Sequence, residues 1–213
     1  MKLELGSILL ATVLGGCATA PVCPEPPAPL VATSEAPATS STSAEVPEAE
    51  PAGAATVVIL VRHAEKAADG SGDPPLTERG QRRAECLATL LRPFAPDHLL
   101  TSQYQRTRAT LEPLARATGL TPRVIDASDD EAWARALHQL PPGSRAVVSG
   151  HSNTLPIWVA ALGVELGGLD AEGNIPHDDY DRMIQVVIDV RGRTVTSFTT
   201  AYCVEPEPAL AGR

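Results

Sequence analysis

An arginine and a histidine at the end of an apolar stretch are the first residues that could do chemistry. Arg62 and His63 directly follow the five aliphatic residues 57–61. A neutral imidazole offers a nitrogen nucleophile, and a guanidinium can hold two phosphate oxygens at once. The pair therefore suits attack on a phosphoryl group. Because most such pairs lie in solvated loops, this interpretation depends on a second arginine and a second histidine elsewhere in the chain.

Arg106 and His151 have the types and places that this chemistry needs. Arg106 lies in the first turn of a helix that the apolar periodicity predicts at 104–118. A cation at that position opposes the helix dipole, so a bound anion would compensate it. His151 comes just after a strand predicted at 145–149. If that strand neighbours the strand at 57–61 in a parallel sheet, both histidines face the same crevice.

Strand and helix patterns alternate along the part of the chain that carries these residues. After the strand at 57–61, apolar runs predict strands at 98–101, 124–125, 145–149, 182–190 and 193–202. Helical spacing predicts helices at 78–92, 104–118 and about 153–162, and one that follows residues 128–131. The alternation predicts an α/β fold with a largely parallel sheet, and the last two strands predict a hairpin.

Two local patterns have a purely structural interpretation. Arg82, Arg83 and Glu85 fall on the polar side of the helix at 78–92, and we expect them to form its solvated face. Residues 128–131, Ser-Asp-Asp-Glu, fit a helix capping box. Trp133, which follows them, is expected to lie in the core.

The N-terminal residues have the pattern of a signal peptide followed by a linker. Residues 5–16 are apolar and too short to span a bilayer, as in a signal peptide. A small-residue pair before Cys17 resembles a bacterial lipoprotein signal, in which the cysteine becomes the lipid-modified N-terminus. The alternatives are an ordinary cleaved signal and a buried strand that contains Cys17. Residues 17–55 are rich in Pro, Ala, Ser and Glu and predict a disordered linker. We therefore expect a signal peptide at 1–16, one folded domain at 56–205 and a tail at 206–213.

Charge and cysteine content restrict the partners further. The formal net charge of −9 argues against nucleic acid, which needs a basic surface. In an export compartment Cys86 and Cys203 could form a disulfide, although Cys86 could equally be a buried free thiol. No Cys or His pair has metal-ligand spacing, so we expect no metal site and no cofactor.

Four motifs in order resemble those of the histidine phosphatase superfamily, also called the phosphoglycerate-mutase-like fold. They are Arg62-His63, Leu76-Thr77-Glu78-Arg79-Gly80, Ser102-x-x-x-Arg106-x-x-x-Thr110 and Gly150-His151. The resemblance covers about residues 56–190 and implies a three-layer α/β/α fold.

The resemblance also implies roles for single residues. His63 would be the nucleophile that becomes a phosphohistidine, and its second ring nitrogen would donate to a backbone carbonyl. Arg62, Arg106 and His151 would surround the phosphoryl group, with no metal required. The proton donor of the family is a carboxylate between the second arginine and the second histidine. Here Asp126 is the first candidate, and the alternatives are Asp129, Asp130 and Glu131.

The leading functional hypothesis is an exported, metal-independent phosphatase that hydrolyses a phosphate ester or a phosphoramidate. Its substrate would be a phosphorylated small molecule or a phosphoprotein. The alternatives are a lipid-anchored module that binds a phosphorylated ligand without turnover, and a phosphomutase. We expect the protein in the bacterial cell envelope, anchored through Cys17; Ala18 after that cysteine favours the outer membrane, facing the periplasm.

Overall fold

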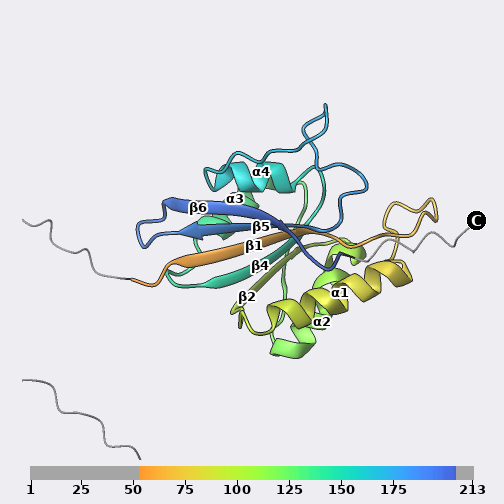
Figure 1. The fold of residues 1–213 in the computed structure, drawn as a ribbon, viewed down its shortest axis with the longest axis horizontal. Helices are drawn as coiled ribbons and strands as arrows, with labels where there is room; N and C mark the ends of the chain where they lie inside the picture. Colours follow the sequence, from red (N-terminus) through yellow and green to blue (C-terminus); the bar gives the residue numbers. More distant parts are fainter. Residues whose placement is uncertain (1–52, 205–213) are drawn as a thin grey trace, which may run out of the picture. The chain divides into compact units, whose positions relative to one another are not determined.

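The computed structural model describes residues 53–204, all of them within the compact unit Glu48–Arg213. This part of the chain forms one six-stranded sheet and four helices (Figure 1). The strands are β1 (Thr56–Arg62), β2 (His98–Ser102), β3 (Arg123–Ile125), β4 (Arg145–Gly150), β5 (Arg182–Ile188) and β6 (Thr194–Ala201). The helices are α1 (Glu78–Leu91), α2 (Gln105–Thr118), α3 (Asp130–His138) and α4 (Leu155–Ala161).

The sheet is mixed, with the strand order β3-β2-β4-β1-β5-β6. The pairs β3–β2, β2–β4 and β4–β1 are parallel, whereas β5 is antiparallel to both β1 and β6. The prediction of an α/β fold is therefore confirmed, and the terminal hairpin forms as expected. The strand β1, buried on both faces, lies near the middle of the sheet, which explains its unbroken aliphatic sequence.

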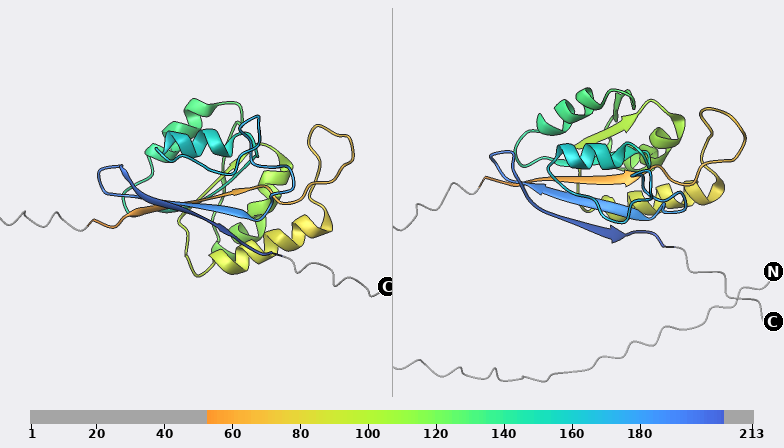
Figure 2. Two further views of the ribbon diagram at one scale, coloured as in Figure 1. Left: turned by 45° about the horizontal axis from the view of Figure 1, so that its top comes forward. Right: turned by 90° about the horizontal axis from the view of Figure 1, so that it is seen from above.

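Helices pack on both faces of the sheet because the side chains of β1 alternate between two apolar clusters. Val58 and Leu60 belong to a cluster with residues of α3 and α4. Ile59 and Val61 belong to another cluster with residues of α1 and α2. Figure 2 shows the two helix pairs separated by the strands. Trp133 is fully buried in the first cluster, as expected.

Two of the local predictions are wrong. The residues 128–131 do not form the expected capping box: Asp129, not Ser128, is the N-cap of α3 and accepts the Ala132 N–H at 2.8 Å. The Glu131 side chain pairs with Arg135 at the surface. Arg83 is not solvated but only 6% exposed, because it has a buried carboxylate partner from a loop far away in the sequence.

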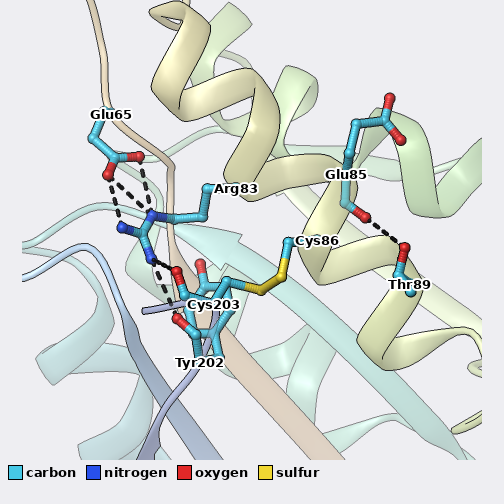
Figure 3. The surroundings of a disulfide bond; sticks show 7 residues. All are labelled: Glu65, Arg83, Glu85, Cys86, Thr89, Tyr202 and Cys203. Atoms are coloured by element: carbon cyan, nitrogen blue, oxygen red, sulfur yellow. Dashed lines mark hydrogen bonds and ion pairs between the residues drawn. A yellow bond between two sulfur atoms is a disulfide. The ribbon is translucent and has the colours of Figure 1, made fainter. Parts of the chain in front are cut away.

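A disulfide joins Cys86 of α1 to Cys203, which follows β6 (Figure 3). Their Cα atoms are 6.1 Å apart, within the usual range for a disulfide. This decides between the two alternatives that the sequence left open, and Cys86 lies on the exposed side of α1 rather than in the core. The predicted signal peptide, Cys17, most of the linker and the tail lie outside the described residues. Between residues 53 and 204, no helix has the length and apolar character needed to cross a membrane.

Candidate active site

The parallel pairing of β1 with β4 brings the two predicted histidines together. Arg62 is opposite Gly150 in the register, and the His63 N–H donates to the Gly150 carbonyl at 2.9 Å. The rings of His63 and His151 are 5.3 Å apart between centroids, edge to face. A Cβ on Gly150 would lie 2.5 Å from the Trp158 ring, so only glycine fits between β4 and α4. The expectation that both histidines face one crevice is met.

The His63 ring has a defined tautomer. Its Nδ1 lies 2.8 Å from the Ala64 carbonyl oxygen. A carbonyl can only accept, so Nδ1 carries the proton and Nε2 keeps its lone pair. Burial lowers the pKa of His63 to about 3, against the effect of the Ala64 carbonyl, and the nearby cationic groups lower it further. His63 is therefore neutral at pH 7, as a nitrogen nucleophile must be.

Arg62 is held by a loop that follows α4. Its Nη1 donates to the carbonyls of Pro176 and His177, both at 2.9 Å. The guanidinium carbon lies 4.2 Å from the centroid of the Tyr180 ring. The Nε of Arg62 is buried, and within residues 53–204 it has no hydrogen-bond partner. The side chain is thus fixed in place while it keeps an unused donor.

Arg106 lies in the first turn of α2, as predicted. Its guanidinium carbon is 4.3 Å from the Tyr104 ring centroid, and its Nη1 is 3.2 Å from the Asp73 carboxylate. Asp73 also accepts the Gln105 N–H at 3.1 Å, so a protein carboxylate compensates both the cation and the helix terminus. The Nε of Arg106 is a second buried donor without a partner in the described part of the chain.

The motif Ser102-x-x-x-Arg106-x-x-x-Thr110 connects these groups. The Ser102 hydroxyl is 2.9 Å from His151 Nε2, in hydrogen-bond contact. The Thr110 hydroxyl accepts the Ala64 N–H at 2.9 Å and donates to the Arg106 carbonyl at 2.8 Å. One strand end and one helix face therefore position both histidines.

His151 is neutral in the free protein. Burial lowers its pKa to about 4, and the charges of Arg106 and Arg62 contribute in the same direction. The backbone N–H of His151 donates to the Thr154 hydroxyl at 3.1 Å, which fixes the turn between β4 and α4. A bound phosphate dianion would favour the protonated ring.

The motif at residues 76–80 packs α1 against the loop that follows His63. Thr77 is the N-cap of α1: its hydroxyl accepts the Gly80 N–H at 3.1 Å, and its own N–H donates to the Glu65 carbonyl at 2.9 Å. A Cβ on Gly80 would lie 2.3 Å from that carbonyl oxygen, so the close approach requires glycine.

The four predicted phosphate-site residues line one cavity of about 400 Å³. Its lining residues are Arg62, His63, Lys66, Tyr104, Arg106, Ala127, Ser128, His151, Ser152, Asn153, Thr154 and His177. A larger hollow of about 670 Å³ between α1 and α2 contains none of the four. The smaller cavity is the candidate active site because the convergent polar groups lie there.

The structure does not bring the predicted proton donor into this cavity. Asp126 is exposed, and its carboxylate accepts the Ser128 N–H at 2.9 Å and the Ser128 hydroxyl at 2.6 Å. These hydrogen bonds lower the pKa of Asp126, so it is ionised rather than a poised acid. The alternatives are also engaged elsewhere: Asp129 caps α3, Asp130 accepts from the Trp158 indole, and Glu131 pairs with Arg135.

Several residues of the site gave no signal in the sequence. The Tyr104 ring packs against both Arg106 and His151, and the Tyr180 ring packs against both Arg62 and His63. Neither tyrosine belongs to a spaced motif. The one available hint for Tyr104 was its place just before the helix that carries Arg106.

Fold and site together define an α/β domain in which Arg62, His63 and His151 lie at the carboxyl ends of two neighbouring parallel strands and Arg106 lies in the first turn of α2. The family model described as the histidine phosphatase superfamily (branch 1) matches residues 58–133. The match covers 76 of the 213 residues and contains three of the four motifs that resemble this superfamily, whereas Gly150-His151 lies beyond it.

Curated relatives have phosphoglycerate-mutase-like names. "Probable phosphoglycerate mutase GpmB" of Photorhabdus laumondii is 32% identical over 112 residues, which cover 41% of this chain and 52% of the relative. The protein of the same name from Escherichia fergusonii is 38% identical over 104 residues, with 38% and 48% covered. The chain thus spans about half the length of the curated relatives that it matches.

Solved structures share the fold over almost their whole length. The protein histidine phosphatase SixA complexed with tungstate has a TM-score of 0.53 at 21% identity, with 69% of this chain and 97% of that chain covered. The structure named mycobacterial hydrolase 1 has a TM-score of 0.51 at 17% identity, with 70% and 98% covered. At these identities the likeness establishes the fold.

Proposed function

We propose that this protein is a metal-independent phosphatase that works through a phosphohistidine on His63. The observation that carries the proposal is the tautomer of His63: Nδ1–H is held by the Ala64 carbonyl, so Nε2 offers its lone pair in a cavity that Arg62, Arg106 and His151 also line. Phosphoryl transfer needs little beyond such positioning and neutralisation of charge.

The reaction has two displacements. In the first, His63 Nε2 attacks phosphorus, a P–N bond forms, and the bond to the leaving group breaks. In the second, water attacks the phosphohistidine, the P–N bond breaks, and inorganic phosphate leaves. Arg62 and Arg106 each have a buried Nε donor for the equatorial oxygens. His151, held at Nε2 by Ser102, would use its other ring nitrogen to bind the same oxygens.

The leaving group is restricted by the position of the carboxylates. Asp126 and its three alternatives are all engaged outside the cavity, so none of them is placed to protonate an alkoxide. A phosphoramidate such as N-phosphorylated imidazole needs no such acid, because the ring leaves as a neutral molecule once its second nitrogen carries a proton. The name of the structural neighbour SixA, a protein histidine phosphatase, agrees with this substrate class. An aryl phosphate, with its stabilised leaving group, should also be turned over.

Turnover of p-nitrophenyl phosphate and of phosphohistidine, with and without a chelator, tests the proposal. We expect His63→Ala to abolish both turnover and the trapped phosphoenzyme. His98→Ala, which removes a half-exposed histidine of β2, is the matched control and should keep both. Activity that disappears with the chelator would refute the metal-independent mechanism. Phosphate binding without turnover would indicate the binding module, and phosphoryl transfer between glycerates would indicate a mutase.

We also propose that the domain at 56–205 is held at the cell envelope by a lipid on Cys17, after removal of residues 1–16. The linker at 17–55 would separate the domain from the outer membrane, on its periplasmic side. The Cys86–Cys203 disulfide supports an oxidising compartment, where disulfides persist. Incorporation of a fatty-acid label that Cys17→Ala abolishes is the expected result. A wild-type protein that is unlabelled and soluble in its native envelope would refute the anchor.

A further inference from the structure

Arg83 joins three segments that lie far apart in the sequence (Figure 3). From α1, its Nε lies 3.0 and 3.1 Å from the two Glu65 carboxylate oxygens, and its Nη2 donates to Glu65 at 2.8 Å. Its Nη1 donates to the carbonyls of Tyr202 at 3.2 Å and Cys203 at 3.1 Å. The guanidinium is 5.8 Å from the Tyr202 ring centroid. One buried cation therefore binds the loop after β1 to the chain that follows β6.

The Glu65 end of this link is two residues from the proposed nucleophile. The Ala64 carbonyl, which orients the His63 ring, belongs to the peptide bond that joins Ala64 to Glu65. A shift of Glu65 would therefore move that carbonyl. Burial alone would raise the pKa of Glu65, but hydrogen bonds from Arg83 and the charges of Arg83 and Arg79 outweigh it and lower the pKa. Glu65 is thus a buried anion. Without Arg83 it would keep only the partner Arg79, whose Nε lies 3.0 Å from the carboxylate but whose side chain is 55% exposed, and the loop would shift towards that partner and the solvent.

The other end of the link depends on the disulfide. Cys203 has φ of 49°, in the left-handed region that residues other than glycine rarely adopt. Its carbonyl meets Arg83 while its sulfur is bonded to Cys86, three positions further along α1. The disulfide therefore holds the chain in an unfavourable conformation that presents two carbonyls to Arg83. Cys86 is exposed and Cys203 half-buried, so a small dithiol can reach the bond.

We propose that Arg83 is a positioning residue for His63 and that the Cys86–Cys203 disulfide sets its position, which makes turnover dependent on oxidation. This inference rests on the proposed function of the same site. Reduction by a dithiol supplies two electrons and two protons, converts the disulfide to two thiols, and leaves the dithiol as its own disulfide. The freed chain after β6 then withdraws its carbonyls, and Arg83 and Glu65 lose their fixed arrangement.

The test measures kcat and KM for p-nitrophenyl phosphate with full-length wild type, Arg83→Gln and Arg83→Lys. Each protein is assayed in its oxidised form and again after reduction with dithiothreitol, below its melting temperature. We expect reduction to lower kcat by about three- to tenfold, or about 0.6–1.4 kcal/mol, with little change in KM. Arg83→Gln should show the same loss and no further loss on reduction. Arg83→Lys should not restore kcat, because an ammonium cannot span a carboxylate and two carbonyls in one planar fork.

The matched control is Arg116→Gln. Arg116 also bridges two glutamates, Glu85 and Glu112, but its side chain is 59% exposed. This variant should keep wild-type kcat and the wild-type response to reduction. If the disulfide only stabilises the fold, its reduction would instead lower the melting temperature without changing kcat, or would lower kcat by the same factor in wild type and Arg83→Gln.

Nitrogen-15 shifts of the His63 ring separate failure of this inference from failure of the proposed function. In the oxidised wild type they should report the proton on Nδ1, whereas the reduced protein and Arg83→Gln should show a mixture of tautomers. A wild type without turnover would refute the proposed function, and the ring shifts would still decide the role of Arg83. Ring shifts and kcat that stay unchanged after verified reduction, or additive effects of reduction and Arg83→Gln, would overturn the inference.

Discussion

Replacement of Thr110 by valine removes one hydroxyl while it keeps the shape of the side chain. That hydroxyl accepts the Ala64 N–H at 2.9 Å, and both residues are fully buried. In Thr110→Val the Ala64 N–H has lost its acceptor and cannot reach water, which costs about 1–3 kcal/mol. For a domain of this size the loss corresponds to a melting temperature lower by about 2–12 °C.

The same substitution should reduce turnover, since the Ala64 backbone also holds the His63 ring. A small displacement of the nucleophile can lower the rate by up to about a hundredfold, so we expect kcat to fall by between about tenfold and a hundredfold. Thr110→Ser is the control: it keeps both hydrogen bonds and loses one methyl group, at a cost of about 0.8 kcal/mol, with kcat near wild type. Calorimetry and p-nitrophenyl phosphate turnover measure the two effects. Equal kcat in the valine and serine variants would refute the argument that Thr110 positions the nucleophile.

Three further substitutions or conditions test other parts of the site. Arg106→Lys keeps the charge but not the planar fork, so kcat/KM should fall by about 10²–10³-fold; a change within about threefold would remove Arg106 from the phosphate site. Asp126→Asn should leave kcat/KM within about twofold and stability within about 0.5 kcal/mol, because the carboxylate is exposed and outside the cavity; a hundredfold loss would restore Asp126 as the proton donor. Burial lowers the pKa of His63 to about 3 and that of His151 to about 4, whereas both are near 6.5 in the unfolded chain. Between a pH of about 3 and a pH of about 6.5 the unfolded chain therefore binds more protons than the folded one. The free energy of unfolding, measured with urea, should therefore fall as the pH is lowered through that window, less steeply in His63→Asn, and a flat profile would contradict the burial of neutral rings.

Much of the scaffold could be predicted because its signals are local. The aliphatic run of β1, the N-cap Thr77 and the cation in the first turn of α2 each depend on neighbours within a few residues. Arg62, His63 and His151 could be placed at one sheet edge because parallel strands that alternate with helices end on the same side. These regularities were sufficient to indicate a resemblance to the superfamily and four residues of the candidate active site.

Contacts between distant segments were decided only by the tertiary structure. The sequence predicted Arg83 on the solvated face of a helix. The structure buries it, because its partners lie 18 residues before it and 119 and 120 residues after it, where no local pattern indicates them. Likewise, the anion that compensates Arg106 is Asp73, 33 residues earlier, and it comes from a loop without regular periodicity.

Tertiary structure was also needed to choose among the carboxylates near residue 126, although these lie close together in the sequence. Sequence placed Asp126 just past a strand end, where a proton donor would be expected, but the hydrogen bonds from Ser128 turn its carboxylate to the exposed side. Which of several neighbouring polar side chains caps a turn depends on differences of about 1 kcal/mol. Tertiary contacts of that size are present here, because Asp130 accepts from the Trp158 indole and the Trp158 ring stacks on Trp133. Sequence determined the elements and the residues at their ends, whereas the long-range packing determined which charged groups face the candidate active site, because burial and charge pairing depend on the whole fold.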